Sequence, residues 1–276
     1  MQVIGSAIMP RQSVNRPSAQ RWAVICAVVL QIGAGFLPRI GIGQFIGDRS
    51  DAVRTLITPA GWAFAIWGPL FALSIIFAVW QALPAQRGNG LLNRIAWPAA
   101  IALGAQGVWS VYTQLANLTF LSVAIILVSL GALLAVMRAL VAEASLSRAE
   151  RLFVAPAFSA LAAWLTAASI VNIAASLKYH GIAGADPAPG VAAAMIGIGA
   201  IIAAIAAWRL RGAPLYGLVS VWALVAINAA GGQRFAEVGH AAQAGIVLVL
   251  AVTVWQLSRK DSRCHWLGGQ ARPTLT

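Results

Sequence analysis

Long apolar stretches alternate with short charged segments along this chain. The stretches without a charged side chain, with His counted as neutral, are 22–38, 55–86, 95–137, 152–177, 187–208, 212–233 and 238–258. A helix needs about 20 apolar residues to cross the roughly 30 Å of hydrocarbon in a bilayer. The stretch 95–137 would form one helix about 64 Å long, and Gln114 and Asn117 mark its middle. We therefore interpret it as two helices joined by a turn.

The pattern predicts an all-α integral membrane protein with eight transmembrane helices. The expected spans are 22–42, 62–82, 95–114, 118–138, 152–176, 190–208, 213–231 and 239–258. Composition supports this class, because 60% of the residues are hydrophobic and only 9% are charged, too few charges to cover a water-soluble fold. An N-terminal arm (1–21) and a C-terminal tail (259–276) flank the spans, and residues 1–20 and 261–276 are expected to be disordered.

The basic residues predict how the helices are oriented. Fourteen Lys and Arg residues fall on the side of the N-terminus in this topology and five on the other, which places both termini in the cytoplasm by the positive-inside rule. The same rule explains the net charge of +12, so no nucleic-acid partner is expected. A signal peptide beginning at Arg11, Arg16 and Arg21 is the alternative, but no small-residue cleavage site follows. Cys26 and Cys264 fall toward the reducing cytoplasm, so no disulfide is expected.

Charged side chains avoid the membrane interior. No Asp, Glu, Lys or Arg lies centrally in an expected span, whereas ion-coupled pumps usually keep a carboxylate there. A transporter that holds its ion with neutral groups at broken helices remains open.

Neutral polar residues form a stripe on the third span. Gln106, Trp109, Ser110, Thr113 and Asn117 recur at helical spacing, so they share one face, which must be directed away from lipid. Hydrogen bonds between helices and the lining of a cavity both explain such a stripe.

The fifth span repeats the pattern. Trp164, Ala168 and Asn172 lie within about 80° of helix arc, among small neighbours that let other helices approach closely. Trp164 either fills core volume or forms the wall of a pocket.

Other motifs are absent from the sequence. His180, His240 and His265 are far apart, and Cys264 beside His265 is a poor metal site, so no bound metal is expected. No pair of nucleophile and base stands out, so we nominate no catalytic residue and favour a non-enzymatic or weakly enzymatic protein, with an enzyme left open.

The entry to the second span, with two later motifs, resembles a known family. The chain reads Pro59-Ala60-Gly61-Trp62-Ala63-Phe64, then Trp67 and Leu70-Phe71; Trp109-Ser110 and a paired Trp164 and Asn172 follow in order. This order is similar to that of the TspO/MBR family, the tryptophan-rich sensory proteins related to the mitochondrial translocator (peripheral benzodiazepine receptor) proteins. The resemblance covers residues 22–177, and the added helices of 178–258 resemble a longer bacterial branch.

The sequence also departs from that family's pattern. Trp62 and Trp67 stand one residue closer together than in compact members, Gln106 replaces an Asn and Phe71 replaces a Tyr. No Lys or Arg follows Tyr179 within five residues, so the family's cholesterol-recognition pattern is missing.

The resemblance implies a five-helix bundle, extended here by three C-terminal helices, in a bacterial inner (plasma) membrane. It further implies a homodimer and a pocket for hydrophobic ligands, notably porphyrins, capped by the loop between the first two helices, here 43–61. No cofactor is expected beyond such a ligand. The ligand-binding residues expected on this basis are Trp62, Phe64, Trp67, Gln106, Trp109, Ser110, Trp164 and Asn172, with Arg49 and Arg54 paired to the propionates.

Three functional hypotheses follow. The first is a membrane receptor for tetrapyrroles or similar apolar ligands, with a sensory, regulatory or transport role. The second is a small-molecule transporter that uses all eight helices, and the third is a porphyrin-degrading enzyme, an activity associated with some relatives.

Overall fold

The computed structural model describes residues 15–182 and 188–269, and over these ranges it contains helices, turns and no strand. Arg11 and the outer parts of the two expected tails, 1–14 and 270–276, lie outside the described residues. The long helices are α1 (Ser18–Ala34), α3 (Trp67–Ala82), α4 (Gly90–Ala116), α5 (Phe120–Ala142), α7 (Ala155–Tyr179), α8 (Pro189–Arg209), α9 (Pro214–Ala230) and α10 (Ala236–Ser258).

Each of the eight expected spans corresponds to one of these helices, so the fold class is confirmed. In residues 15–182 and 188–269, six helical segments are long and apolar enough to cross a membrane, and α1 is apolar but has 17 residues. The predicted first span ends eight residues too late, because the helix ends at Ala34 and the chain then turns through a 3₁₀ segment (Leu37–Ile40) that contains Pro38. Between Gly61 and Ile66 the chain forms a second 3₁₀ segment, η2. Pro69 then falls in the first turn of α3. A proline is tolerated there, because an N–H group in the first turn has no partner within the helix.

Short helices connect or follow the long ones. They are α2 (Ile46–Ala52), α6 (Arg148–Phe153) and α11 (Lys260–Leu267). Ser147 caps α6 in a capping box with Glu150, which satisfies donors at both residues.

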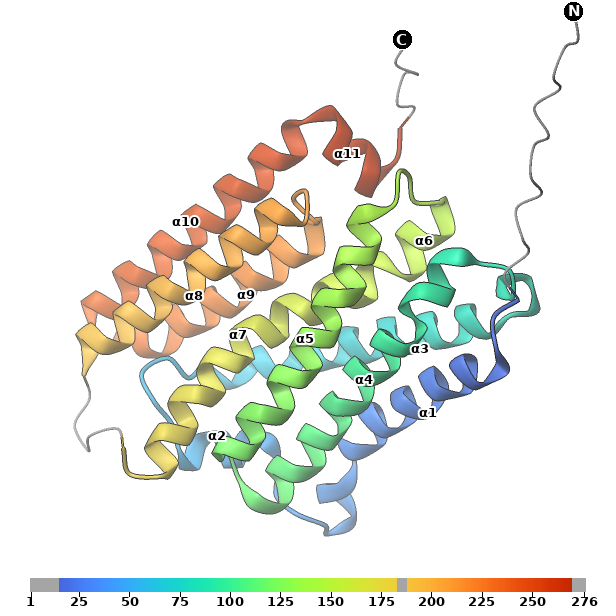
Figure 1. Ribbon diagram of the computed structural model, residues 1–276. Coiled ribbons are helices and arrows are strands. Elements are labelled where there is room, and N and C mark those ends of the chain that lie inside the picture. The colour runs from blue at the N-terminus through green and yellow to red at the C-terminus, as the bar shows by residue number, and fades with distance from the viewer. Residues whose placement is uncertain (1–14, 183–187, 270–276) are drawn as a thin grey trace, which may run out of the picture.

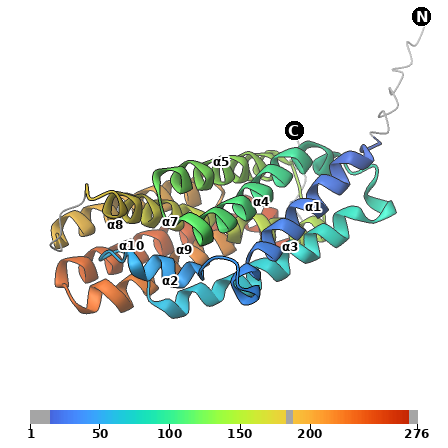
Figure 2. The ribbon, with the colours of Figure 1, turned by 90° about the horizontal axis from the view of Figure 1, so that it is seen from below.

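The long helices run side by side in two groups, with α7 between them. Helix α4 packs against α1 and α5, and α5 packs against α7. On the other side, α10 packs against α8 and α9. Figure 1 shows α8, α9 and α10 as one group and α1, α3, α4 and α5 as the other, and Figure 2 shows the same helices from below. Helix α7 contacts α3, α5, α8 and α9, so it joins the five-helix part to the three-helix extension (α8–α10).

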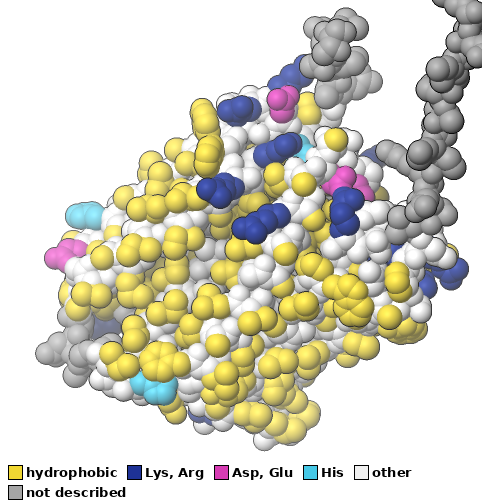
Figure 3. All heavy atoms as spheres, viewed as in Figure 1, with side chains coloured by type: hydrophobic (Ala, Val, Ile, Leu, Met, Phe, Trp, Pro, Cys, Tyr) yellow, Lys and Arg dark blue, Asp and Glu magenta, His cyan; other side chains and the backbone are white. Residues whose placement is uncertain are grey.

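Hydrogen bonds gather the beginning and the end of the described chain at one end of the bundle. Arg16 N–H donates to Arg87 O at 2.9 Å, Asn89 Nδ2 donates to Glu150 Oε1 at 3.3 Å and Arg151 Nη1 donates to Cys264 O at 3.3 Å. On the face seen in Figure 3, most Lys and Arg side chains lie toward this end, which we call the α11 end. Because the chain passes along the bundle an even number of times, as the eight predicted spans require, the start of α1 and the helix α11 lie at the same end.

The expectation of a disordered tail is wrong for residues 261–267, which form most of α11. His265 and Trp266 are buried, and Trp266 Nε1 donates to Leu210 O at 3.0 Å. The buried indole and its hydrogen bond offset the conformational entropy lost when this segment becomes ordered. The polar composition of the segment gave no sign of this helix.

Acid is expected to loosen α11. Burial, followed by the nearby charge of Arg211, lowers the pKa of His265 from 6.5 to about 4. As the pH falls, the unfolded chain therefore takes up the proton on His265 before the folded chain does. The stability contributed by the neutral, buried His265 is present above about pH 6.5 and is lost toward pH 4. Thermal unfolding midpoints measured across that range should fall less steeply with acid in His265→Phe than in the parent protein. Equal slopes would contradict this assignment.

Candidate functional site

A cavity of about 50 Å³ lies where α4, α7 and α9 meet the connection between α1 and α3. Its wall is almost wholly apolar or aromatic. The lining residues are Ile46, Ser50, Pro59, Phe64, Trp109, Leu118, Trp164, Ala167, Ala168, Val171, Asn172, Ala223 and Ile227. Four of the predicted site residues are among them: Phe64, Trp109, Trp164 and Asn172.

Two of the lining side chains are buried indoles whose N–H groups are unpaired. Trp109 is 5% exposed and Trp164 is 4% exposed, and Nε1 of each has no hydrogen-bond partner within the part of the chain that the structure describes. An indole N–H can only donate, and leaving a buried donor unpaired costs about 1–3 kcal/mol. Such groups in a native fold call for an explanation, and an ordered water or a functional role can supply it.

Asn172 adds a third polar group. Its Oδ1 accepts a hydrogen bond from Ser122 Oγ at 3.0 Å, and its Nδ2 is buried without a partner. The amide is thus held by a hydrogen bond on one side only.

Aromatic contacts fix the position of Trp164. The ring of Phe64 lies edge-on to it at 6.2 Å between centroids, and Trp67 lies edge-on at 6.1 Å. Trp67 in turn stacks on Phe71 at 5.4 Å. Trp67 therefore supports the wall from behind, since it is absent from the lining itself.

Residues 43–66 close one end of the cavity, and we call them the cover. The first half of the cover is fastened to the C-terminus of α4. Gln44 N–H and Arg49 Nη2 each donate to Gln114 O at 3.0 Å, and Arg49 Nη2 also reaches Leu115 O at 3.2 Å. Carbonyls at the end of a helix lack partners within it, and a cation there is favourable. At Gly43, with φ of +75°, a Cβ would lie 2.8 Å from Gln114 O, so this close approach requires glycine.

The remaining predicted residues are placed elsewhere. Trp62 is 45% exposed, and its ring lies 4.8 Å from that of Trp222 in α9. Ser110 accepts a hydrogen bond from Gln114 Nε2 at 2.8 Å, and Gln106 is buried with Oε1 unpaired, outside the lining. Arg54 donates to Asp51 through Nε at 3.1 Å.

The polar stripe on α4 is thus directed inward, as predicted, and serves mainly packing. All five of its residues are buried, but only Trp109 lines the cavity. On α7, by contrast, Trp164, Ala168 and Asn172 all do, so that face belongs to the cavity.

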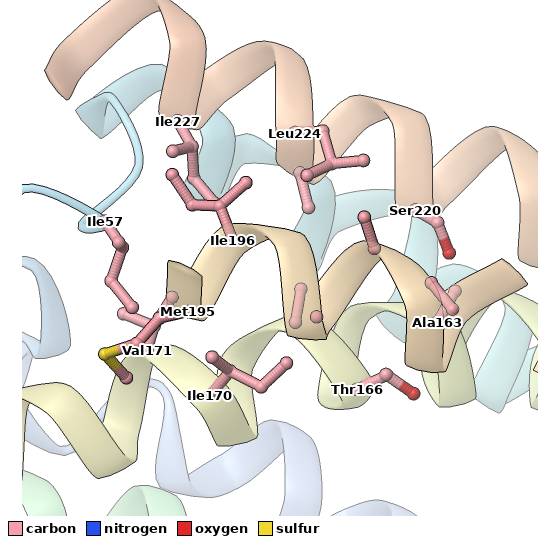
Figure 4. A pocket seen from close by; sticks show the side chains of 15 residues that line it. Ile57, Ala163, Thr166, Ile170, Val171, Met195, Ile196, Ser220, Leu224 and Ile227 are labelled. Carbon is pink, nitrogen blue, oxygen red and sulfur yellow. The ribbon is translucent and has the colours of Figure 1, made fainter. Parts of the chain in front are cut away.

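A second cavity of about 40 Å³ adjoins the first. Side chains from α7, α8 and α9 surround it, and Figure 4 shows Ile57 of the cover reaching toward Val171 and Met195. The two cavities share Ala167, Val171, Ala223 and Ile227 in their walls.

Sequence reasoning missed the contributions of α2 and α9 to the first cavity. Ile46 and Ser50 come from α2, and Ala223 and Ile227 come from α9. No residue type distinguishes these positions from ordinary core residues. The nearest signal was Trp222, one residue before the lining position Ala223.

One comparison with known proteins gave a match. A family model described as TSPO-like protein matches residues 18–255. The match runs from the start of α1 into α10, so it includes the three-helix extension as well as the five helices that carry the sequence resemblance. No curated protein and no solved structure matches the chain.

Proposed function

The chain belongs to the family of TSPO-like proteins, and on this premise we propose that its first cavity is the binding site for a flat, largely apolar ligand of the tetrapyrrole class. The observation that carries the proposal is the pair of buried, unpaired indole donors of Trp109 and Trp164 in an aromatic wall. A ligand that supplies acceptor atoms there satisfies both donors at once. The protein then acts as a membrane receptor.

The chemistry of a tetrapyrrole fits this wall. Its π surface can pack against Trp164 and Phe64, and its nitrogen or carboxylate acceptors can take hydrogen bonds from Trp109, Trp164 and Asn172. An anionic propionate can pair with Arg54, whose side chain is 40% exposed, in exchange for Asp51. Arg49 is engaged with the end of α4 and serves the cover.

The size of the cavity shows what binding requires. About 50 Å³ has room for a few water molecules, whereas pockets for drug-sized ligands measure about 300–1,000 Å³. The cavity is therefore the closed form of the proposed site. Movement of the cover, which supplies Ile46, Ser50, Pro59 and Phe64 to the wall, is the step that makes room.

The orientation in the membrane is part of the same proposal. The 14-to-5 division of Lys and Arg, together with their gathering at the α11 end in Figure 3, supports a cytoplasmic location for that end. The cover, at the opposite end of α4, then faces the other side of the membrane.

Filling the cavity is expected to prevent binding. Ala168 lines the cavity from α7, so Ala168→Phe places a ring where the ligand must sit and should weaken binding of protoporphyrin IX more than about 10-fold. The measurement is a titration in detergent, in the dark, that follows the porphyrin absorption band against protein-free micelles.

Val128→Phe is the matched control, because Val128 is 56% exposed on α5 and lines none of the described cavities. It should bind as the parent protein does. If the parent protein changes the porphyrin spectrum no more than protein-free micelles do, the proposed function is refuted. Steady loss of the band with time would instead indicate degradation.

A further inference from the structure

The second half of the cover rests on the three-helix extension. Ala60 N–H donates to Ala226 O of α9 at 3.0 Å, and the indole Nε1 of Trp222 donates to Ala63 O at 3.2 Å. The rings of Trp62 and Trp222 meet edge to face at 4.8 Å. These contacts lie on either side of Gly61, where η2 begins.

Ile57 inserts the cover into the core of the extension. Its side chain is 2% exposed and belongs to a hydrophobic cluster with Ile196, Leu224 and Ile227. In Figure 4 it extends from the cover into the second cavity, between α7 on one side and α8 and α9 on the other. Burying such a side chain contributes about 1.5–3 kcal/mol, so Ile57 anchors residues 53–66 in the extension.

The backbone of the cover also passes directly against the end of α9. At Gly231 a Cβ would lie 2.0 Å from Leu56 O, closer than any side chain tolerates. Helix α9 reaches the ligand cavity as well, because Ala223 and Ile227 line it. The same helix therefore forms a wall of the cavity and holds the segment that closes it.

We propose that α9 is a latch on the cover: Trp222, Ala226 and the cavity that receives Ile57 hold residues 53–66 closed, and the site admits its ligand when this contact is released. The identity of that ligand rests on the proposed function, whereas the existence of a closed and an open state of the cover does not depend on it. Release of residues 53–66 withdraws Pro59 and Phe64 from the wall, while α2 stays fastened to α4 through Arg49. Trp222 and Ile57 are positioning residues in this scheme.

Thiol accessibility tests the latch without any ligand. The reporter is Ala168→Cys, which lines only the first of the two cavities, in a background where Cys26 and Cys264 are replaced by Ser. The rate of its modification by a water-soluble maleimide measures how often the cover opens. Trp222→Phe keeps an aromatic ring beside Trp62 but removes the donor, and should raise the rate roughly 3- to 10-fold. Ile57→Ala should raise it about 30-fold or more.

Two controls match these variants. Trp208→Phe removes an indole that is 51% exposed on α8, and Ile42→Ala shortens a side chain that is 45% exposed just before the cover; neither should change the rate. A second reporter, Ala102→Cys, sits fully buried in α4 and detects general unfolding.

The proposal requires faster modification of Cys at 168 with an unchanged rate at 102. It is overturned if Trp222→Phe and Ile57→Ala react no faster than their controls, or if both reporters accelerate equally, since α9 would then stabilise the whole bundle and not the cover. A protein that binds no porphyrin yet shows the selective acceleration would lose the proposed function and keep the latch.

Discussion

Replacing Trp109 and Trp164 together with phenylalanine is expected to raise the Kd for protoporphyrin IX about 100-fold. Each substitution removes one N–H donor that has no partner among the described residues, and a hydrogen bond to an ionised or strongly polar acceptor contributes about 1.5 kcal/mol, or roughly 10-fold in affinity. The two losses add to about 100-fold when each indole donates to its own acceptor atom on the ligand. Aromatic surface remains at both positions, and the loss is therefore one of hydrogen bonding more than of stacking.

The stability of this double variant provides a second signature. Phenylalanine fills less of the core than tryptophan, which lowers stability, but it also removes a buried unpaired donor, which raises it. The unfolding midpoint should therefore fall much less than in Trp164→Ala, while binding falls in both. Trp208→Phe combined with Trp255→Phe is the control, because those indoles are 51% and 52% exposed. Binding by the Trp109 and Trp164 variant within about 3-fold of the parent value would contradict the donor assignment.

Gly107→Ala is expected to cost about 1–3 kcal/mol of stability, through the contact between α1 and α4. A Cβ at position 107 would lie 2.8 Å from Leu30 Cγ and 2.9 Å from Gln31 N. Because Gln31 N belongs to the backbone of α1, the helix as a whole must move. Separation of α1 from α4 would also disturb the segment that follows α1 and leads into the cover.

The next turn of the same interface supplies the control. At Gly104 a Cβ would lie 3.8 Å from Ala27 Cβ, an ordinary contact, and Ala is the better helix former by about 1 kcal/mol. Gly104→Ala should therefore unfold at the same temperature as the parent protein or slightly higher, and Gly107→Ala several degrees lower. Equal midpoints would show that α1 and α4 are not held as closely as their backbones indicate.

The long helices were predictable from the sequence because lipid imposes a simple rule on them. Every backbone group in the membrane needs a partner within the protein, so each apolar stretch of sufficient length becomes a helix. The split of 95–137 at Gln114 and Asn117 was correct: α4 ends at Ala116 and α5 begins at Phe120. What escaped prediction were α2, α6 and α11, whose lengths of 7, 6 and 8 residues give too little periodicity to detect.

The candidate site was predictable only in part. Trp164, Ala168 and Asn172 were found because helical spacing placed them on one face, and that face does line the cavity. Trp62 was expected to line the pocket with them, but its ring packs against that of Trp222 in α9. Its position depends on the packing of α9, which lies about 160 residues later in the chain. A local pattern carries no information about such a contact.

The most direct test of the central claim observes the two indole protons while the ligand binds. With ¹⁵N-labelled tryptophan, the Nε1–H resonances of Trp109 and Trp164 can be assigned from their Phe variants and followed as protoporphyrin IX is added. Both resonances are expected to shift and to saturate together with binding, while those of Trp208 and Trp255 stay in place. Porphyrin that binds with the signals of Trp109 and Trp164 unmoved would contradict this expectation.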